Sequence, residues 1–336
     1  MIEKNKYNIL LLSSGIALLI LVIAALSMGR YSMNPVDVLR AVHARVTGVS
    51  TNDAMEIVLF RIRLPRVIAS LLVGAALSMS GAVYQSTFRN PLVSPDLLGV
   101  SSGASMGAVV AIFLGVSFQT IPIFAFAGGI LAVLLATSLP KILRNSSNMM
   151  LVLSGIIISG FMSSVVGVMM MLSREQDQLS AIVFWQMGSL NRVNYTQLAV
   201  VAPVSLVCIA IMIMISWRLN ILSFGEQEAQ TVGVNVNRLR WIAIACASLL
   251  TANAVSISGT IGWIGLVIPH FGRLICGSDN TKLLPMSALL GGAFLLVIDT
   301  IARVATTFEL PLSILVGLVG APFFAWLLYR HKVKIL

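Results

Sequence analysis

Charged residues are scarce in this chain. Only 10% of its 336 residues are charged, while 58% are hydrophobic and the mean hydropathy is +0.96. A soluble domain carries about 25% charged residues, so the composition excludes an ordinary soluble protein. Apolar stretches long enough to cross a bilayer recur along the whole chain. The sequence therefore indicates an all-α, polytopic membrane protein that forms a single transmembrane domain over residues 1–336.

Residues that usually carry chemistry are also few. The three cysteines, Cys208, Cys246 and Cys276, are scattered among apolar residues without a CxxC or Cys/His cluster. This indicates neither a disulfide framework nor a metal site. The sequence also lacks a Walker A motif, an HExxH motif and paired membrane carboxylates. We therefore expect no metal, no cofactor and no enzymatic activity of its own.

The net charge of +10 is the next feature to explain. No basic segment interleaved with aromatic residues is present, so the charge does not indicate a nucleic-acid partner. It is better read as a membrane topology signal. If both termini are cytoplasmic, more lysines and arginines fall on the inner side than on the outer side, as the positive-inside rule requires.

The lengths of the apolar stretches, and the polar, glycine and proline residues that separate them, predict ten membrane spans. An even number of spans places both termini on one side of the membrane. The first has an apolar core that suits a spanning helix better than a cleaved signal peptide. The third is expected to start at Ser94 as N-cap with Pro95 as its first residue. The eighth is short and interrupted by Gly265 and Pro269. The spans are 9–28, 64–86, 96–115, 121–140, 149–173, 196–217, 240–257, 261–275, 283–304 and 312–330.

Three arginines, Arg61, Arg63 and Arg66, stand just ahead of the apolar run that begins at Val67, around the start of the second span. On the predicted topology they lie outside, against the positive-inside rule, and the positive end of the helix dipole should repel them. They could be interfacial anchors whose charged heads reach water. They could instead wait for a negatively charged partner. Arg303 also lies at an outer helix end, where Asp299 at i−4 can pair with it, so Asp299 is expected to have a structural role.

An internal echo suggests two halves of inverted topology. The segment LSMSGAVYQ at 77–85 resembles VSISGTIGW at 255–263, and the two occupy equivalent positions five spans apart on opposite faces. Inverted repeats of this kind occur in many transporters. The fifth span is dense in serine and glycine, and Ser159 and Ser163 could line a pathway, with ordinary helix packing as the alternative.

The polar segment at about 218–239 predicts a helix–turn unit on the cytoplasmic side. Gly225 allows the chain to turn, and Glu226 then lies in the first turn of a short helix, where the dipole favours it. Ala229 keeps one face small, and Gly233 suits a left-handed helix stop. Such a unit has the shape of a docking element rather than a catalytic one; a plain amphipathic loop is the alternative.

The chain resembles the FecCD-type permeases, the membrane subunits of binding-protein-dependent ABC importers for siderophores, haem and cobalamin. The resemblance covers nearly the full length. It rests on RLPR (63–66), GAALSMSGAVYQSTFRNPLVSPDLLGVSSGA (74–104), GEQEAQTVG (225–233), SGTIGWIGLVIPHFGRLICG (258–277), LLPMSALLGGAFLLVIDTIAR (283–303) and ELPLSILVGLVGAPFFAWLL (309–328).

This resemblance implies the partners. Two permease subunits, identical or paralogous, would form the channel in a bacterial or archaeal cytoplasmic membrane. Two cytoplasmic ATPases would bind the unit at 225–233, and a periplasmic or lipid-anchored substrate-binding protein would dock outside. In the family, acidic side chains of the substrate-binding protein meet arginines at the positions of Arg63, Arg66 and Arg303. The resemblance therefore implies that these three arginines bind a negatively charged partner.

The expected cargo is a ferric siderophore, with haem, cobalamin and oxyanions such as molybdate left open. Two other classes of function compete with this interpretation. An ion-coupled secondary transporter should show ionisable residues near the membrane midplane, and no convincing set is present. An intramembrane hydrolase would rest on Ser105, in a GASMG match to the G-x-S-x-G pattern, or on His270; the pattern falls inside a predicted span, where helix packing explains it better.

Overall fold

Helices account for every regular element in the parts of the chain that the computed structural model describes, residues 4–47, 53–145, 147–173, 175–306 and 308–332. The first half contains α1 (Lys4–Ser27), α2 (Pro35–Thr47), α3 (Asp53–Glu56), η1 (Ile57–Arg63), α4 (Leu64–Thr87), η2 (Pro95–Leu98), α5 (Val100–Phe113), α6 (Ile121–Ile142) and α7 (Asn148–Leu172). The second half contains α8 (Gln176–Gln186), α9 (Tyr195–Phe224), α10 (Glu226–Thr231), α11 (Val236–Ser258), α12 (Ile264–Cys276), α13 (Asn280–Val304) and α14 (Leu312–Lys332).

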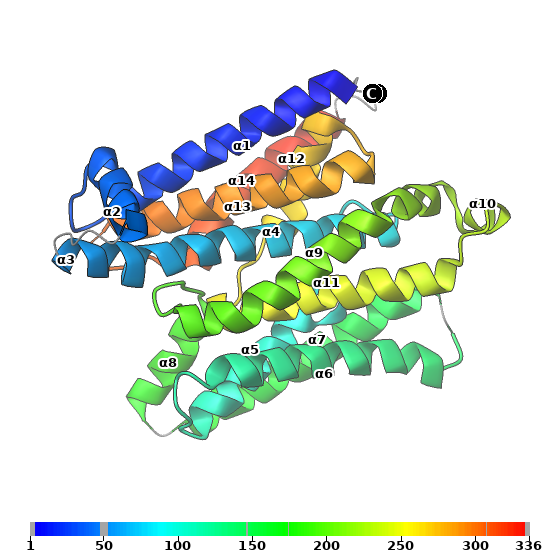
Figure 1. The fold of residues 1–336 in the computed structure, drawn as a ribbon. Coiled ribbons are helices and arrows are strands. Elements are labelled where there is room, and N and C mark those ends of the chain that lie inside the picture. Colours follow the sequence, from blue (N-terminus) through cyan, green and yellow to red (C-terminus); the bar gives the residue numbers. More distant parts are fainter. Residues whose placement is uncertain (1–3, 48–52, 146, 174, 307, 333–336) are drawn as a thin grey trace.

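The long helices run side by side as a bundle (Figure 1). The short helices α2, α3 and α8 lie at one end, called here the α2 end, and α10 projects from the other, called the α10 end. Within the described residues seven helices are long and apolar enough to cross a membrane, and α5, α12 and part of α14 form three shorter apolar helices. Each of these ten overlaps one of the ten predicted spans.

The start of the second span differs from the prediction. The helix does not begin at residue 64, because α3, η1 and α4 follow one another without a break from Asp53 to Thr87. The η1 segment is a π-helix, in which the N–H of Leu64 bonds to the carbonyl of Leu59. Arg63 and Arg66 therefore lie inside a helical segment rather than at its N-terminus. The dipole argument against them does not apply.

Two other boundaries were also mispredicted. The third span was predicted to start at Ser94 and Pro95, but these residues start only a 3-10 turn. Gly99, with φ +76°, separates this turn from α5, which begins at Val100. At the α10 end, α9 continues seven residues past the predicted end at 217, to Phe224. Its 30 residues span about 45 Å, longer than the ~30 Å apolar core of a bilayer. The last turns of α9 thus carry α10 away from the apolar zone, and the predicted loop at 218–239 shrinks accordingly.

The centre of the bundle is the contact between α4 and α13. Both helices use glycine where they cross: a Cβ atom on Gly74 would lie 2.2 Å from the carbonyl oxygen of Gly291. One helical turn further, the hydroxyl of Ser78 donates to the carbonyl of Ser287 at 2.6 Å. Helices in lipid associate through such close backbone approach and through interhelical hydrogen bonds. The hydrophobic effect does not drive them together, because the acyl chains are as apolar as the helix side chains.

The packing follows the two inverted halves that the echo predicts. Helix α4 packs against α13, and its counterpart α11 packs against α6. The two echo helices also pack on each other, where the hydroxyls of Tyr84 and Ser248 lie 2.6 Å apart. Each is followed by a break with a residue at positive φ before the next apolar helix, Gly99 in the first half and Trp263 in the second.

The Gly74–Gly291 contact predicts a stability effect. Replacing Gly74 with Ala should lower the free energy of unfolding by about 1–3 kcal/mol, because the new methyl group forces α4 and α13 apart. Gly15 in α1 is the matched control, since a Cβ atom added there would have nothing within 4 Å. SDS-induced unfolding in mixed micelles measures both variants. Equal stability of the two would contradict the close crossing.

Candidate functional site

The three arginines singled out by the sequence gather at the α2 end, but they are not exposed. Arg63, Arg66 and Arg303 are only 4%, 5% and 8% accessible. A buried guanidinium is costly unless it is paired and hydrogen-bonded. The hydrogen bonds and ion pairs of each arginine within the protein therefore decide whether its guanidinium can also bind a partner.

Arg66 is paired with two carboxylates. Its Nε donates to both oxygens of Asp299 at 2.9 and 3.1 Å, and its Nη1 donates to Glu309 at 2.9 Å. Asp299 is completely buried, and the Nε of Arg303 lies 3.5 Å from its second oxygen. The predicted pairing of Asp299 with Arg303 is confirmed, as is a structural role for Asp299. The stronger partner, Arg66, is distant in sequence and was missed, as was Glu309.

Arg63 serves the end of α1. Its guanidinium donates to the carbonyls of Leu26 and Ser27 at 2.6 and 3.0 Å, and also to the carbonyl of Tyr31. These carbonyls belong to the C-terminus of α1 and the segment after it, where a helix leaves carbonyls unpaired and its dipole favours a cation. Gly29 has no side chain because Arg63 fills that space: a Cβ there would lie 2.5 Å from Nη2.

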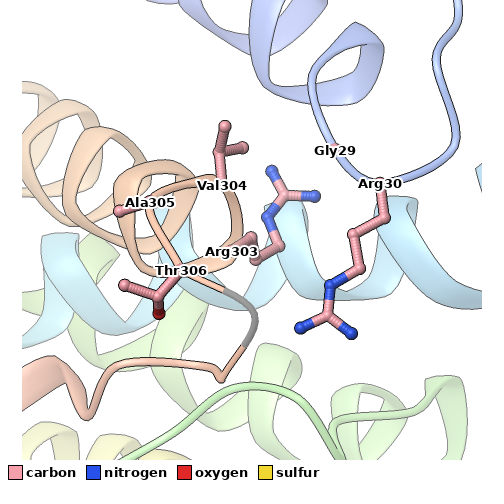
Figure 2. A pocket seen from close by; sticks show the side chains of 6 residues that line it. All are labelled: Gly29, Arg30, Arg303, Val304, Ala305 and Thr306. Atoms are coloured by element: carbon pink, nitrogen blue, oxygen red, sulfur yellow. The ribbon is translucent and has the colours of Figure 1, made fainter.

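A pocket of about 520 Å³ opens beside Arg303 (Figure 2). One wall is Gly29 and Arg30, and the other is the end of α13 with the three residues after Arg303. Arg303 donates through Nη2 to the carbonyl of Ala25 at 2.9 Å, while its buried Nε makes no hydrogen bond. Arg30 is exposed and was not identified from the sequence.

A larger cavity of about 840 Å³ lies at the same end, between the α5–α6 loop, α8, the end of α11 and residues 308–311. Its lining is mixed, with aromatic side chains such as Trp185 and Phe118, several hydroxyls, and Arg192 stacked 4.2 Å from the Phe118 ring. Glu309 also lines it, so the carboxylate that holds Arg66 faces this cavity.

The α10 unit has the predicted form. Gly225 turns the chain with φ +146°, Glu226 begins the helix, Ala229 is fully buried, and Gly233 adopts φ +84° just after the helix ends. Glu226 forms an ion pair with Arg240 of α11, a partner that the sequence did not reveal. The turn is thus attached to both helices that carry it, while its tip remains free for a partner.

The tip of the α10 unit is exposed and partly apolar. Phe224 is 78% and Val232 63% accessible, on either side of the polar residues of α10. Its base is tied down by Asn220, whose amide donates to Asp279 at 2.7 Å and accepts from the N–H of Asn280 at 2.7 Å. Hydrogen bonds from Thr281 and Asn220 outweigh the cost of burial and hold the pKa of Asp279 below its usual value.

The two serines predicted to line a pathway differ in their surroundings. Ser159 is half-buried, and a Cβ on Gly99 would lie 2.9 Å from its hydroxyl, so it packs against the break before α5. Ser163 is exposed on the free face of α7, between Gly160 and Gly167, where an added Cβ atom would have nothing within 4 Å. Among the described residues this face has no cover, although it is part of a spanning helix.

The hydrolase alternative finds no support in the geometry. Ser105 is buried within α5, not on the strand-to-helix elbow that exposes a nucleophile in G-x-S-x-G enzymes. His270 lies in α12. The described residues contain no group of three or more His, Cys, Asp or Glu side chains placed to hold a metal ion.

Comparison with known proteins supports one interpretation of these features. The model of the FecCD transport family matches residues 17–330. The molybdate import system permease MolB of Haemophilus influenzae is 38% identical over 98% of both chains. An iron chelatin transport system permease of Helicobacter pylori is 45% identical over 83% of this chain and 85% of its own. A solved structure of an inward-facing metal-chelate type ABC transporter superposes with a TM-score of 0.86 at 37% identity, covering 96% of this chain and 99% of that one.

The buried ion cluster predicts that Asp299 is essential to the fold. Replacing it with Asn should lower the free energy of unfolding by about 3–5 kcal/mol, because Arg66 and Arg303 would lose the charge that neutralises them. Asp37→Asn is the control, since it removes an exposed ion pair with Arg40 at 3.9 Å and should cost about 1 kcal/mol or less. SDS-induced unfolding of both variants measures these free energies. Equal decreases in the two variants would contradict the assignment of a larger stabilising role to the buried cluster than to the exposed ion pair.

Proposed function

This chain belongs to the FecCD transport family and is a membrane permease of an ABC importer, and we propose that its cargo is a ferric siderophore or a similar metal chelate. The iron-chelate relative at 45% identity and the metal-chelate structural neighbour favour this cargo. Molybdate remains an alternative because a relative of nearly full coverage carries that name. Haem and cobalamin also remain open, since one scaffold can serve several cargoes.

The α10 unit supports the proposal most directly, as the place where two ATPases bind. An exposed helix–turn with an apolar tip, tied to α9 and α11, can pass motion from a bound subunit into the bundle. We assign Gly225, Glu226, Ala229 and Gly233 to this coupling role. The α10 end is then cytoplasmic, together with the start of α1 and the end of α14 (Figure 1).

The α2 end then faces outward, where a substrate-binding protein, periplasmic or lipid-anchored, docks. Arg63, Arg66 and Arg303 lie at this end, and although their side chains are buried, we assign them to the docking site. Charge complementarity between the two surfaces would speed their encounter and fix their orientation more than it would add affinity.

The uncovered face of α7 suits a second permease, identical or paralogous, with the pathway between the two subunits. Ser163 on that face, and Ser159 next to it, would line the pathway near the subunit boundary. Exposed serines and glycines on a spanning helix are costly against lipid and reasonable against water or a partner helix.

Reconstitution tests this assignment. The permease is placed in liposomes with the ATPase and binding protein encoded beside it, and uptake of ⁵⁵Fe-siderophore is compared with that of labelled haem, cobalamin and molybdate. ATP-dependent uptake of the ferric chelate is expected. Uptake that follows an ion gradient without ATP would instead support a secondary transporter, and preference for another cargo would correct the substrate.

The Glu226–Arg240 pair predicts a rescue. Glu226→Lys should detach or uncouple the ATPase, because it places two cations together at the base of α10. Adding Arg240→Glu should restore most of the loss by reversing the pair. Co-purification of the ATPase and transport-linked ATP hydrolysis measure this. If the single variant behaves as wild type, or if the double variant is worse, the coupling assignment fails at this position.

The free face of α7 predicts a transport defect without a folding defect. Ser163→Phe should slow uptake at least severalfold while expression and thermal stability stay near wild type, because Ser163 is exposed and no described residue lies within 4 Å of a Cβ added at Gly160 or Gly167. Ser138→Phe, exposed on α6, is the control and should transport normally. Ser159→Phe is less informative because that side chain packs inside the subunit. Equal uptake by the Ser163 and Ser138 variants would assign Ser163 to a lipid-facing surface.

A further inference from the structure

Three basic side chains gather where α6 ends and α11 begins, at the α10 end of the bundle (Figure 1). Lys141 lies in the last turn of α6, and its Nζ is 4.5 Å from the centre of the Trp241 ring on α11. The other two cations each lie three residues from this contact, Arg144 after Lys141 and Arg238 before Trp241. All three basic side chains are exposed.

No carboxylate of the described residues is ion-paired with any of these three cations. The helices around them, α6, α7 and α11, contain no acidic residue. Two glutamates of α10 are near in sequence, but Glu226 is paired with Arg240. The carboxylate of Glu228 folds back on its own turn and fills the space beside Gly225. The positive charge at this corner is therefore not neutralised within the described chain.

The backbone of Arg144 indicates a function for its side chain. Arg144 has φ +52°, and its N–H bonds to the carbonyl of Lys141 at 3.1 Å while the N–H of Asn145 bonds to Pro140 at 3.0 Å, which closes the last turn of α6. Helix ends of this kind favour glycine or asparagine, because a larger side chain is strained in the left-handed region. An arginine held there at a conformational cost points to a role for its guanidinium.

Apolar side chains accompany the cations. Ile142 and Leu143 stand between Lys141 and Arg144 in the chain, and both are exposed, as is Trp241. Tryptophan with neighbouring lysine and arginine is typical of the boundary between the bilayer and water. A phospholipid matches this arrangement, because its phosphate can accept hydrogen bonds from the cations while its acyl chains cover the apolar side chains.

We propose that Lys141, Arg144 and Arg238 bind the headgroup of one anionic phospholipid of the cytoplasmic leaflet, and that Trp241 positions Lys141 for this contact. The cytoplasmic place of the α10 end comes from the proposed function, but the site needs neither cargo nor partner subunit. An acidic surface of the ATPase is the competing occupant, since α10 begins ten residues before α11. The lipid is favoured because the exposed apolar side chains between the cations suit acyl chains better than a water-soluble surface.

Native mass spectrometry of the purified permease, with phosphatidylglycerol added in a neutral detergent, measures this binding. The wild type should retain one phosphatidylglycerol more tightly than it retains phosphatidylcholine. Lys141→Gln and Arg238→Gln should each raise the dissociation constant of that lipid about fivefold, the effect of one basic side chain near an anionic membrane surface. Both side chains are exposed, so both variants should fold.

Arg144→Gly separates lipid binding from stability. Glycine adopts the observed φ of +52° without strain, so the thermal stability of this variant in detergent without added lipid should equal or exceed that of the wild type. Its affinity for phosphatidylglycerol should still fall about fivefold, because the guanidinium is lost. Unchanged affinity in this variant would remove Arg144 from the site and overturn the inference.

Arg218→Gln is the matched control. Arg218 is exposed near the same end of the bundle and follows Trp217, but it belongs to α9 rather than to α6 or α11. Its loss removes the same charge and should change the affinity for phosphatidylglycerol less than twofold. Equal losses in the Arg218 and Arg238 variants, or equal retention of the two lipids by the wild type, would reduce the site to unspecific attraction and overturn the inference.

Two further outcomes separate this inference from its rival and from the proposed function. If Arg238→Gln loses the ATPase on co-purification but keeps the lipid, the three cations belong to the ATPase interface and the inference is wrong. If the wild type retains the lipid as expected but shows no ATP-dependent uptake with its partners, the lipid site stands and the importer assignment fails.

Discussion

The close crossing of α4 and α13 is the contact on which the rest of the molecule depends. Glycines at the crossing bring the two backbones together, and the Ser78–Ser287 hydrogen bond follows one turn away. The same pair is joined at both ends: Ser86 of α4 donates to Asn280 of α13 at 2.7 Å, and Arg66 of α4 holds Asp299 of α13. Close packing between the ends and polar bonds at both ends make one rigid two-helix unit.

This unit connects the two places where partners are proposed to bind. At the α10 end, Asn220 of α9 bonds to the first residues of α13, just below the coupling turn. At the α2 end, the last turn of α13 supplies Arg303 to the pocket. A displacement of the coupling turn can thus reach the pocket through one packed pair of helices.

The sequence predicted what local patterns determine. Apolar length gave the ten spans, and glycine spacing gave the α10 turn, with Gly225 and Gly233 both at positive φ. It could not predict interactions between distant residues, so Arg66 with Asp299, Glu226 with Arg240 and Asn220 with Asp279 were all missed. The π-helical turn before Arg63 was also missed, because the second span was predicted to start at residue 64, near the beginning of the apolar run, while the helix already extends from Asp53.

Burial also changes what the arginine motif means. A motif arginine that already makes two or three internal bonds gains little from a new carboxylate, since it must first give up a partner and leave that group unpaired in a dry site. Arg66 would have to release Asp299 or Glu309, and Arg63 would have to expose the end of α1. Arg303 is bound in the same way, since its Nε lies 3.5 Å from Asp299 and its Nη2 donates to the carbonyl of Ala25. A buried motif arginine can therefore be required for docking through the positions of the segments that it holds, whether or not it touches the partner.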